Sequence, residues 1–348
     1  MSRNALFQCI LLLAAAGMAC PAASPLSTGQ TNRNAPVVIV RDTRATAKFL
    51  PNAAIVRDMV NRGLMRLAGE KNPAAAWRSL VSTQDIIGIK VFSAAGQISG
   101  TRPAVAAAVV RGLLEAGVPK DHIIIWDKHL SDLRLAGFYD LSRRLGVRLA
   151  GSVDSGYDPT NFYLPDSPII GRLVYGDLEF GKKGKNVGKK SFVSLLLSRR
   201  LTKIISIAPL LSQNSAGVCG QLYSVAMGSV DNTFRFRGNP GQLAVAVPEI
   251  YALPSVGGRV VLNVTDALLG QYEGGPAGYL QYSQVLNQLW FSRDPVALDT
   301  LAVTQLKQER RERRAPEMPV NSLLYANAAL LELGVNDPSK IKIETINQ

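Results

Sequence analysis

The sequence carries the run IIGIKVF at residues 86–92 and the run IIIW at residues 123–126, which Asp127 closes. Both runs are short, almost wholly apolar and rich in β-branched residues, which is typical of strands buried on both faces of a sheet. Similar runs lie at Val37–Val40, Lys203–Ala208, Arg259–Val264 and Gln288–Phe291, and Ile341–Ile346 is a possible last edge strand. Together these runs predict the strands of one sheet.

Helical patterns separate the predicted strands. They cover Ala53–Leu67, Arg102–Leu114, Asp132–Leu145, Leu243–Leu253, Pro295–Gln308 and Ser322–Leu333. Strands that alternate with helices of this length predict an α/β fold, with a mixed, largely parallel sheet flanked by helices. We expect one large domain or two fused lobes over residues 37–348, with ligands bound at the carboxyl ends of the strands.

The composition narrows the class of protein. Of 348 residues, 47% are hydrophobic and 19% are charged, so the chain can bury a large core. Three cysteines and two histidines are too few for the usual zinc site or for an iron–sulfur cluster held by four cysteines. No Gly-x-Gly-x-x-Gly follows the first predicted strand, so NAD binding is not expected.

The first 23 residues have the pattern of a secretory signal peptide. Arg3 gives a positive start, an apolar stretch follows, and small residues allow cleavage near Ala23. Lipid attachment at Cys20 is the less favoured alternative. Residues 24–36 are predicted to form a flexible tether, and the mature protein is expected to be secreted or periplasmic.

Basic stretches account for much of the net charge of +13. One lies at residues 182–190, within the Gly-, Pro-, Asp- and Lys-rich stretch 154–190, which we expect to be an insertion or a lid over one end of the sheet. The other lies at residues 310–314. Neither has interleaved aromatic residues, so nucleic acid is not an expected partner. They are solvated basic faces, or they give weak electrostatic association with the cell envelope.

Two charged residues close predicted strands. Lys90 follows the apolar stretch 86–89 near the carboxyl end of the first predicted strand, where a lysine can offer a point charge to an anionic group. Asp127 closes the second predicted strand, where it could orient a substrate hydroxyl, bind a metal ion or cap the next loop. A lysine turned toward solvent is the alternative for Lys90.

Further acids and glycines form a second candidate cluster. Asp266 closes a predicted strand, and Glu273 returns seven residues later on a loop with Gly274 and Gly275. Glycines let the backbone approach a ligand closely, and two carboxylates can hold a cation or divide acid and base roles. Asp299 lies among apolar residues of a predicted helix, so it needs a buried partner. It either anchors the active end of that helix or pairs with an arginine.

Several motifs in this order resemble the uncharacterised DUF362 proteins. They are IKV at 89–91, EAG at 115–117, IWD at 125–127, NSAGVC at 214–219, GSVDN at 228–232, EGGP at 273–276 and DPVALD at 294–299. The resemblance runs from about Val37 to Lys307 and implies an α/β domain, but no known activity. It adds Asn214 to the candidate ligand-binding residues.

The chain departs from the pattern of that family at several positions. Cys219 stands for a threonine, and Leu211, Ser212 and Gln213 stand for a Lys-x-His or similar polar set. Phe92 stands where the resemblance implies an asparagine, Tyr223 and Ser224 stand for a lysine and an asparagine, and Met227 stands for a histidine. The ferredoxin-like cysteine run of many relatives is absent as well. Either the chemistry of the family is weakened here, or the acids carry it and the replaced positions tune the choice of substrate.

We therefore expect a small-ligand cleft at the carboxyl ends of the strands. As an enzyme, Lys90 would position a small anionic substrate, while Asp127, Asp266 and Glu273 bind a divalent cation or transfer protons. Asn214, Gly274, Gly275 and Asp299 would contact the ligand. The alternatives are a non-catalytic protein that binds a small anion or metal, and an envelope-associated scaffold.

Overall fold

A nine-stranded sheet runs through the part of the chain that the computed structural model describes, residues 34–348 without 183, 185 and 318. The predicted signal peptide and the tether up to residue 33 lie outside the described residues. The strand order is β15-β1-β14-β13-β11-β4-β5-β6, and β12 pairs with β11. The bounds are β1 Ala35–Arg41, β4 Ile87–Val91, β5 Ile123–Asp127, β6 Arg148–Gly151, β11 Lys203–Gln213, β12 Gly217–Val218, β13 Val260–Gln271, β14 Ser283–Ser292 and β15 Ile341–Asn347.

The main sheet is mixed and largely parallel, as predicted. β14 runs antiparallel to both of its neighbours, β13 and β1. The remaining neighbours along the path from β15 to β6 pair in parallel. The carboxyl ends of β4, β5 and β6 therefore meet at one edge of the sheet, and β15 is an edge strand.

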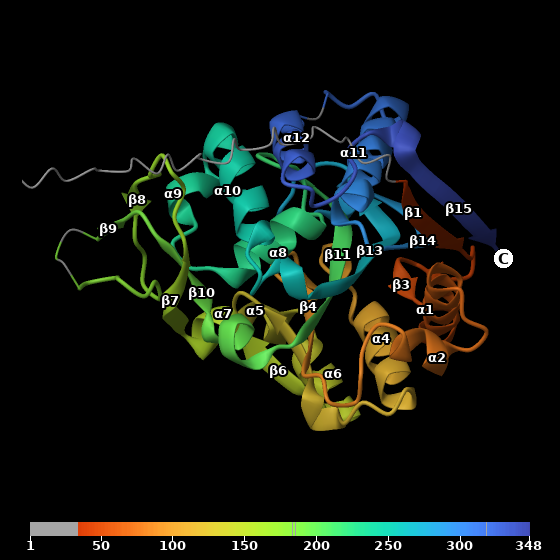
Figure 1. The fold of residues 1–348 in the computed structure, drawn as a ribbon. Coiled ribbons are helices and arrows are strands. Elements are labelled where there is room, and N and C mark those ends of the chain that lie inside the picture. The colour runs from red at the N-terminus through yellow and green to blue at the C-terminus, as the bar shows by residue number, and fades with distance from the viewer. Residues whose placement is uncertain (1–33, 183, 185, 318) are drawn as a thin grey trace, which may run out of the picture. The chain divides into compact units, whose positions relative to one another are not determined.

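Helices cover both faces of the sheet (Figure 1). Their bounds are α1 Ala53–Ala68, α2 Pro73–Arg78, α3 Gly96–Ser99, α4 Pro103–Glu115, α5 Leu130–Leu135, α6 Phe138–Leu145, α7 Ser152–Ser155, α8 Gln221–Ser229, α9 Phe234–Arg237, α10 Pro240–Ala252, α11 Pro295–Glu312 and α12 Ser322–Leu330. With the sheet they form a single α/β domain.

The central strands divide their side chains between two hydrophobic cores. In β5, Ile123 and Ile125 join the core that also holds apolar residues of α1, α2 and α4. Ile124 and Trp126 join the core formed with α8, α10, α11 and α12. Successive side chains of a strand point to opposite faces, which is why a strand covered on both sides is apolar throughout.

Some predicted elements have different limits in the structure. The helix expected at Asp132–Leu145 is two helices, α5 and α6, because Gly137 between them has a φ of +83°. Such a left-handed conformation suits glycine and stops a helix. β13 and β14 are longer than predicted, and α8 and β6 were not predicted at all.

The stretch 154–190 lies outside the main sheet. It contributes β7 Tyr157–Tyr163, which pairs with β10 Ser191–Ser194, and the short hairpin of β8 Gly171–Arg172 and β9 Val187–Gly188. A second small hairpin, β2 Thr46–Ala47 with β3 Leu50–Pro51, precedes α1. In Figure 1, β8 and β9 lie at the opposite end of the domain from β1 and β15. Within the described residues, no helix is both long and apolar enough to cross a bilayer.

Candidate binding cleft

A cleft of about 230 Å³ opens where β4, β5 and β6 end. The segments that follow these strands contribute Phe92, Ala94, Asp127, Lys128, His129, Asp132 and Val153. α8 and the segment through α9 add Tyr223, Ser224, Met227, Gly228, Thr233, Phe234 and Arg237. The insertion supplies Tyr157 and residues 174–177, and Pro276 completes the lining. The walls are thus mainly aromatic and apolar, with a few charged groups.

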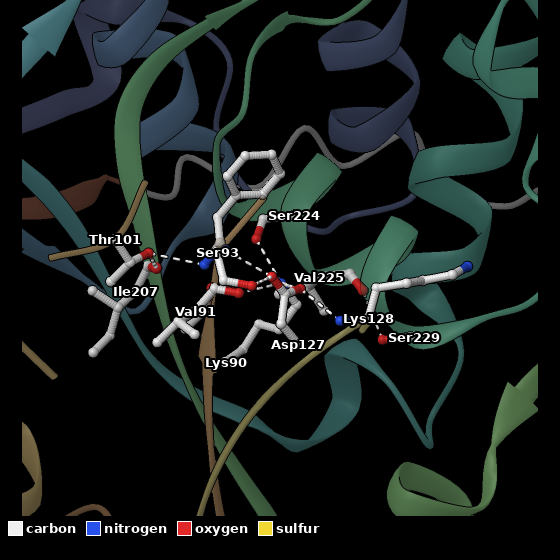
Figure 2. A network of polar contacts seen from close by, with 12 residues as sticks. Lys90, Val91, Ser93, Thr101, Asp127, Lys128, Ile207, Ser224, Val225 and Ser229 are labelled. Atoms are coloured by element: carbon white, nitrogen blue, oxygen red, sulfur yellow. Dashed lines mark hydrogen bonds and ion pairs between the residues drawn. The ribbon is translucent and has the colours of Figure 1, made fainter. Parts of the chain in front are cut away.

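A buried ion pair lies at the floor of this cleft. The Lys90 Nζ is 2.9 Å from Asp127 Oδ1, and both side chains are almost fully buried (Figure 2). The same ammonium donates to the Val91 carbonyl at 2.7 Å and to Ser224 Oγ at 2.9 Å. Asp127 Oδ2 accepts from both the backbone N–H and the hydroxyl of Ser93, each at 2.7 Å. The structure thus brings together two of the residues that the sequence singled out.

Burial and the ion pair together shift the pKa values of both groups. Burial lowers the pKa of Lys90, and the Asp127 carboxylate opposes that shift without cancelling it. Burial acts to raise the pKa of Asp127, but Lys90 and Ser93 outweigh it, and the pKa is lowered. Since three acceptors surround the ammonium, its hydrogens are all used within the protein.

The helix α8 covers this pair closely. A Cβ at Gly228 would lie 2.4 Å from Lys90 Cε, so only glycine lets the helix approach to this distance. Asp299 anchors the start of the same helix: its Oδ1 accepts from the Gln221 N–H at 2.6 Å and its Oδ2 from the Leu222 N–H at 3.0 Å. Burial raises the pKa of Asp299 to about 7, although these two hydrogen bonds act to lower it.

Two cations on the cleft wall have no carboxylate partner at ion-pair distance among the described residues. Lys128 donates to the Val230 carbonyl, and burial lowers its pKa to about 8. In Figure 2 its side chain extends away from the Lys90–Asp127 pair. The Arg237 guanidinium lies 4.1 Å from the centre of the Phe234 ring. Stacking of this kind occupies the face of a guanidinium and leaves its N–H edges for hydrogen bonds.

The insertion is held to the cleft by two aspartates. Asp231 Oδ2 accepts from the Leu178 N–H at 2.7 Å, and Asp177 Oδ1 accepts from the Asn232 N–H at 2.8 Å. Asp231 Oδ1 also accepts from the Phe192 N–H at 2.6 Å. Burial raises the pKa of Asp231 to about 6 against these hydrogen bonds, and the nearby Asp177 adds to the rise.

Asp266 does not reach the cleft. It is fully buried, its Oδ1 lies 2.8 Å from Arg102 Nη1, and its Oδ2 accepts from the Arg102 N–H at 2.9 Å. The carboxylate therefore fixes the start of α4 to the middle of β13. We expected Asp266 and Asp127 to act on one ligand, but only Asp127 lines the cleft.

Glu273 and its two glycines have structural surroundings of their own. Glu273 is partly exposed and lies 3.6 Å from Arg310 Nη1. A Cβ at Gly275 would lie 1.6 Å from the Ser212 carbonyl oxygen, and one at Gly274, where φ is +79°, would meet the Tyr279 ring. These glycines let the loop pack against β11 and Tyr279. Pro276 lines the cleft, but Glu273, Gly274 and Gly275 do not.

The remaining two candidates also lie away from the lining. Asn214 is exposed in the turn between β11 and β12. Asp299 is buried beneath α8, where it caps the helix instead of contacting a ligand or an arginine. Among the described residues, no group of three or more His, Cys, Asp or Glu side chains is placed to hold a metal ion.

Most residues of the cleft wall were not among the candidates predicted from the sequence. Lys128 directly follows the strand-end residue Asp127, so the rule that singled out Asp127 could also have found it. Asp231 stands in the GSVDN motif, which was noted without a role. Nothing in the sequence indicates that Tyr157, in the insertion, and Arg237, on the short helix α9, face the same cleft.

No family model matches the chain, and no curated protein matches it. A crystal structure of a protein from Thermotoga maritima is similar over 85% of this chain, with 13% identity and a TM-score of 0.38. The chain spans about three-fifths of the length of that protein, since the match covers 61% of it.

Proposed function

We propose that this protein binds a small organic anion with an apolar body in the cleft at the ends of β4, β5 and β6. One observation carries the proposal: the two cations of the cleft have no carboxylate partner at ion-pair distance among the described residues, whereas its deeper carboxylates accept hydrogen bonds from the protein. Asp127 and Asp177 each accept hydrogen bonds at both oxygens from protein donors. Lys128 and Arg237 have no ion-pair partner within the described part of the chain.

The remaining carboxylate of the lining is Asp132, which is half-buried, and burial raises its pKa. A carboxylate or phosphate in the cleft would therefore meet two cationic donors, and charge-assisted hydrogen bonds of this kind are about twice as strong as neutral ones. The phenol of Tyr157, which has no hydrogen-bond partner among the described residues, offers a further donor.

The size and lining of the cleft limit the ligand. Pockets for drug-sized molecules span roughly 300–1,000 Å³, and this cleft has a volume of about 230 Å³. The ligand that fits is therefore smaller than a drug-sized molecule. Phe92, Tyr175, Tyr223, Met227 and Phe234 would contact its apolar part.

The proposed relationship to the DUF362 proteins bears on the same cleft. Of the residues that depart from the pattern of that family, Phe92, Tyr223, Ser224 and Met227 line it, whereas Leu211, Ser212, Gln213 and Cys219 do not. Because the four lining residues replace polar or ligating residues that the resemblance implies, this cleft is more apolar than the family pattern. This supports a binding role for an apolar anion over the metal-assisted reaction.

A series of ligands that differ in charge alone tests the proposal. 3-Phenylpropionate, 3-phenylpropan-1-ol and 3-phenylpropylamine share one apolar body. At about 100 times its dissociation constant a ligand adds about 2.7 kcal/mol to stability, which shifts a thermal midpoint by a few degrees. We expect the propionate to raise the midpoint most. An equal or larger shift with the amine contradicts the proposal.

A proton-transfer enzyme is the second candidate, and the buried Lys90–Asp127 pair at the cleft floor favours it. Perturbed ionisable groups at the base of a cleft are common in active sites. Lys90→Met would abolish turnover in an enzyme, whereas a binding protein would keep ligand affinity within a few-fold if the variant folds.

We also propose export from the cytoplasm, on the pattern of residues 1–23. A reporter fused after residue 36 and found in the cytoplasm would contradict this proposal.

A further inference from the structure

The hairpin of β8 and β9 has one face turned toward the protein and one turned outward. Gly171 pairs with Gly188 and Arg172 with Val187. Paired residues share a face and successive residues alternate, so Arg172 and Val187 point to the same side. The flanking Ile170 and Lys189 continue this side by alternation, and all four of these residues are exposed.

The inward face fixes the hairpin in place. A Cβ at Gly171 would lie 2.3 Å from Arg235 Cβ, and one at Gly188 would lie 2.8 Å from Asn232 Nδ2. Leu173 is buried on the same side, and its N–H donates to the Asn186 carbonyl at 2.7 Å. The two glycines thus let the hairpin lie flat against the start of α9 (Figure 1).

The outward face combines apolar and cationic side chains. Val187 is 53% exposed and lies opposite Arg172 in the ladder, and Ile170, which precedes β8, is 66% exposed. Residues 164–190 contain six lysines and arginines against three acids. We name Ile170, Arg172, Val187 and Lys189 the hairpin patch.

We propose that the hairpin patch binds peripherally to the surface of an anionic lipid bilayer. Its cations would meet the lipid headgroups, and its apolar side chains would enter the boundary between headgroups and acyl chains. A soluble anionic polymer would use the cations alone and leave Ile170 and Val187 in water. The exposed apolar side chains therefore favour a bilayer. The inference does not depend on the ligand of the cleft.

Vesicle sedimentation of the full chain tests this surface. The vesicles contain phosphatidylcholine alone, or phosphatidylcholine with 30% phosphatidylglycerol. We expect binding to the anionic vesicles, about thirtyfold weaker with R172Q/K189Q, because each basic residue near the surface contributes roughly fivefold. I170S/V187S should weaken it about tenfold. R143Q/R144Q on α6 and L135S/L330S, which remove exposed residues elsewhere, should leave it unchanged.

Each other outcome overturns the proposal. Equal binding to neutral and anionic vesicles contradicts the role of the cations. Loss with R172Q/K189Q but none with I170S/V187S shows attraction to the anionic headgroups alone and contradicts insertion of the apolar side chains. Unchanged binding in both patch variants places any membrane contact elsewhere in the chain. Far-ultraviolet circular dichroism establishes that each variant is folded, and these surface substitutions remove no buried contact.

Discussion

Each of the two aspartates Asp177 and Asp231 accepts a hydrogen bond from the backbone N–H of the residue that follows the other. Asp231 accepts from the N–H of Leu178, one residue after Asp177, and Asp177 accepts from the N–H of Asn232, one residue after Asp231. This reciprocal pair of hydrogen bonds joins the insertion to the segment between α8 and α9. It forms one wall of the cleft without using any element of the main sheet.

The first prediction concerns the pH dependence of this wall. The pKa of Asp231 is raised to about 6 in the folded protein, above its value of about 3.9 in an unfolded chain. The folded state therefore binds this proton more tightly, and stability from this group falls as the pH rises from about 4 to about 6. The destabilisation caused by Asp231→Asn should be smaller at pH 7 than at pH 4.5, as measured by urea unfolding.

The opposite change would contradict that assignment. If Asp231→Asn costs as much or more at pH 7 than at pH 4.5, the carboxylate is not held by burial in the way the structure indicates. Asp140→Asn, on the exposed face of α6, provides a matched control, since Asp140 lies outside the cleft. Its effect should be small at both pH values.

The second prediction concerns the Lys90–Asp127 pair. Lys90→Met leaves the Asp127 carboxylate buried without its counter-charge, which typically costs about 3–5 kcal/mol. Removal of both charges in Lys90→Met/Asp127→Leu should be less costly than the single change. Denaturant unfolding of the variants gives these free energies. A double variant that loses the sum of both single effects would show that the two groups do not interact.

The third prediction separates Asp266 from the cleft. Because Asp266 is buried against Arg102, Asp266→Asn should lower the free energy of unfolding by about 3 kcal/mol and leave ligand affinity unchanged. Arg237→Gln should lower ligand affinity and leave the free energy of unfolding almost unchanged, because Arg237 is exposed on the cleft wall. Calorimetric titration beside urea unfolding checks both. Loss of affinity in a folded Asp266→Asn protein would restore the original hypothesis for that residue.

The fourth prediction concerns the glycine loop after β13. Gly275→Ala must displace the Ser212 carbonyl, so it should destabilise the fold by about 1–3 kcal/mol or more. Gly238→Ala is the matched control, because no atom lies within 4 Å of a Cβ at that position. A thermal melt that shows equal midpoints for the two variants would mean that the loop does not pack against β11 as described.

The sequence was sufficient to predict most strands of the main sheet, but not the surroundings of its acids. Runs such as residues 86–89 and 123–126 are apolar because helices cover both faces of the sheet, and this pattern can be read from neighbouring residues in the sequence. Lys90 and Asp127 could be predicted together because parallel strands end at the same edge of the sheet. The partner of Asp266 could not, since Arg102 lies 164 residues away in the chain.

The walls of the cleft needed three-dimensional information for the same reason. Tyr157 and Asp177 belong to an insertion whose path has no regular periodicity, and Arg237 ends a helix of four residues. Asp299 illustrates a different limit. Its burial among apolar residues was readable from the helix pattern, but the choice between an arginine and a helix terminus depends on packing between α11 and α8.

The most direct test of the central claim is a calorimetric titration of the full chain with 3-phenylpropionate. It compares the parent with Lys128→Gln/Arg237→Gln and with Arg143→Gln/Arg144→Gln, which removes the same charge from α6. If the two cleft cations bind the anion, the first variant should lose affinity by at least tenfold and the second should keep it. Equal affinity in all three proteins would contradict the assignment of the cleft as an anion site.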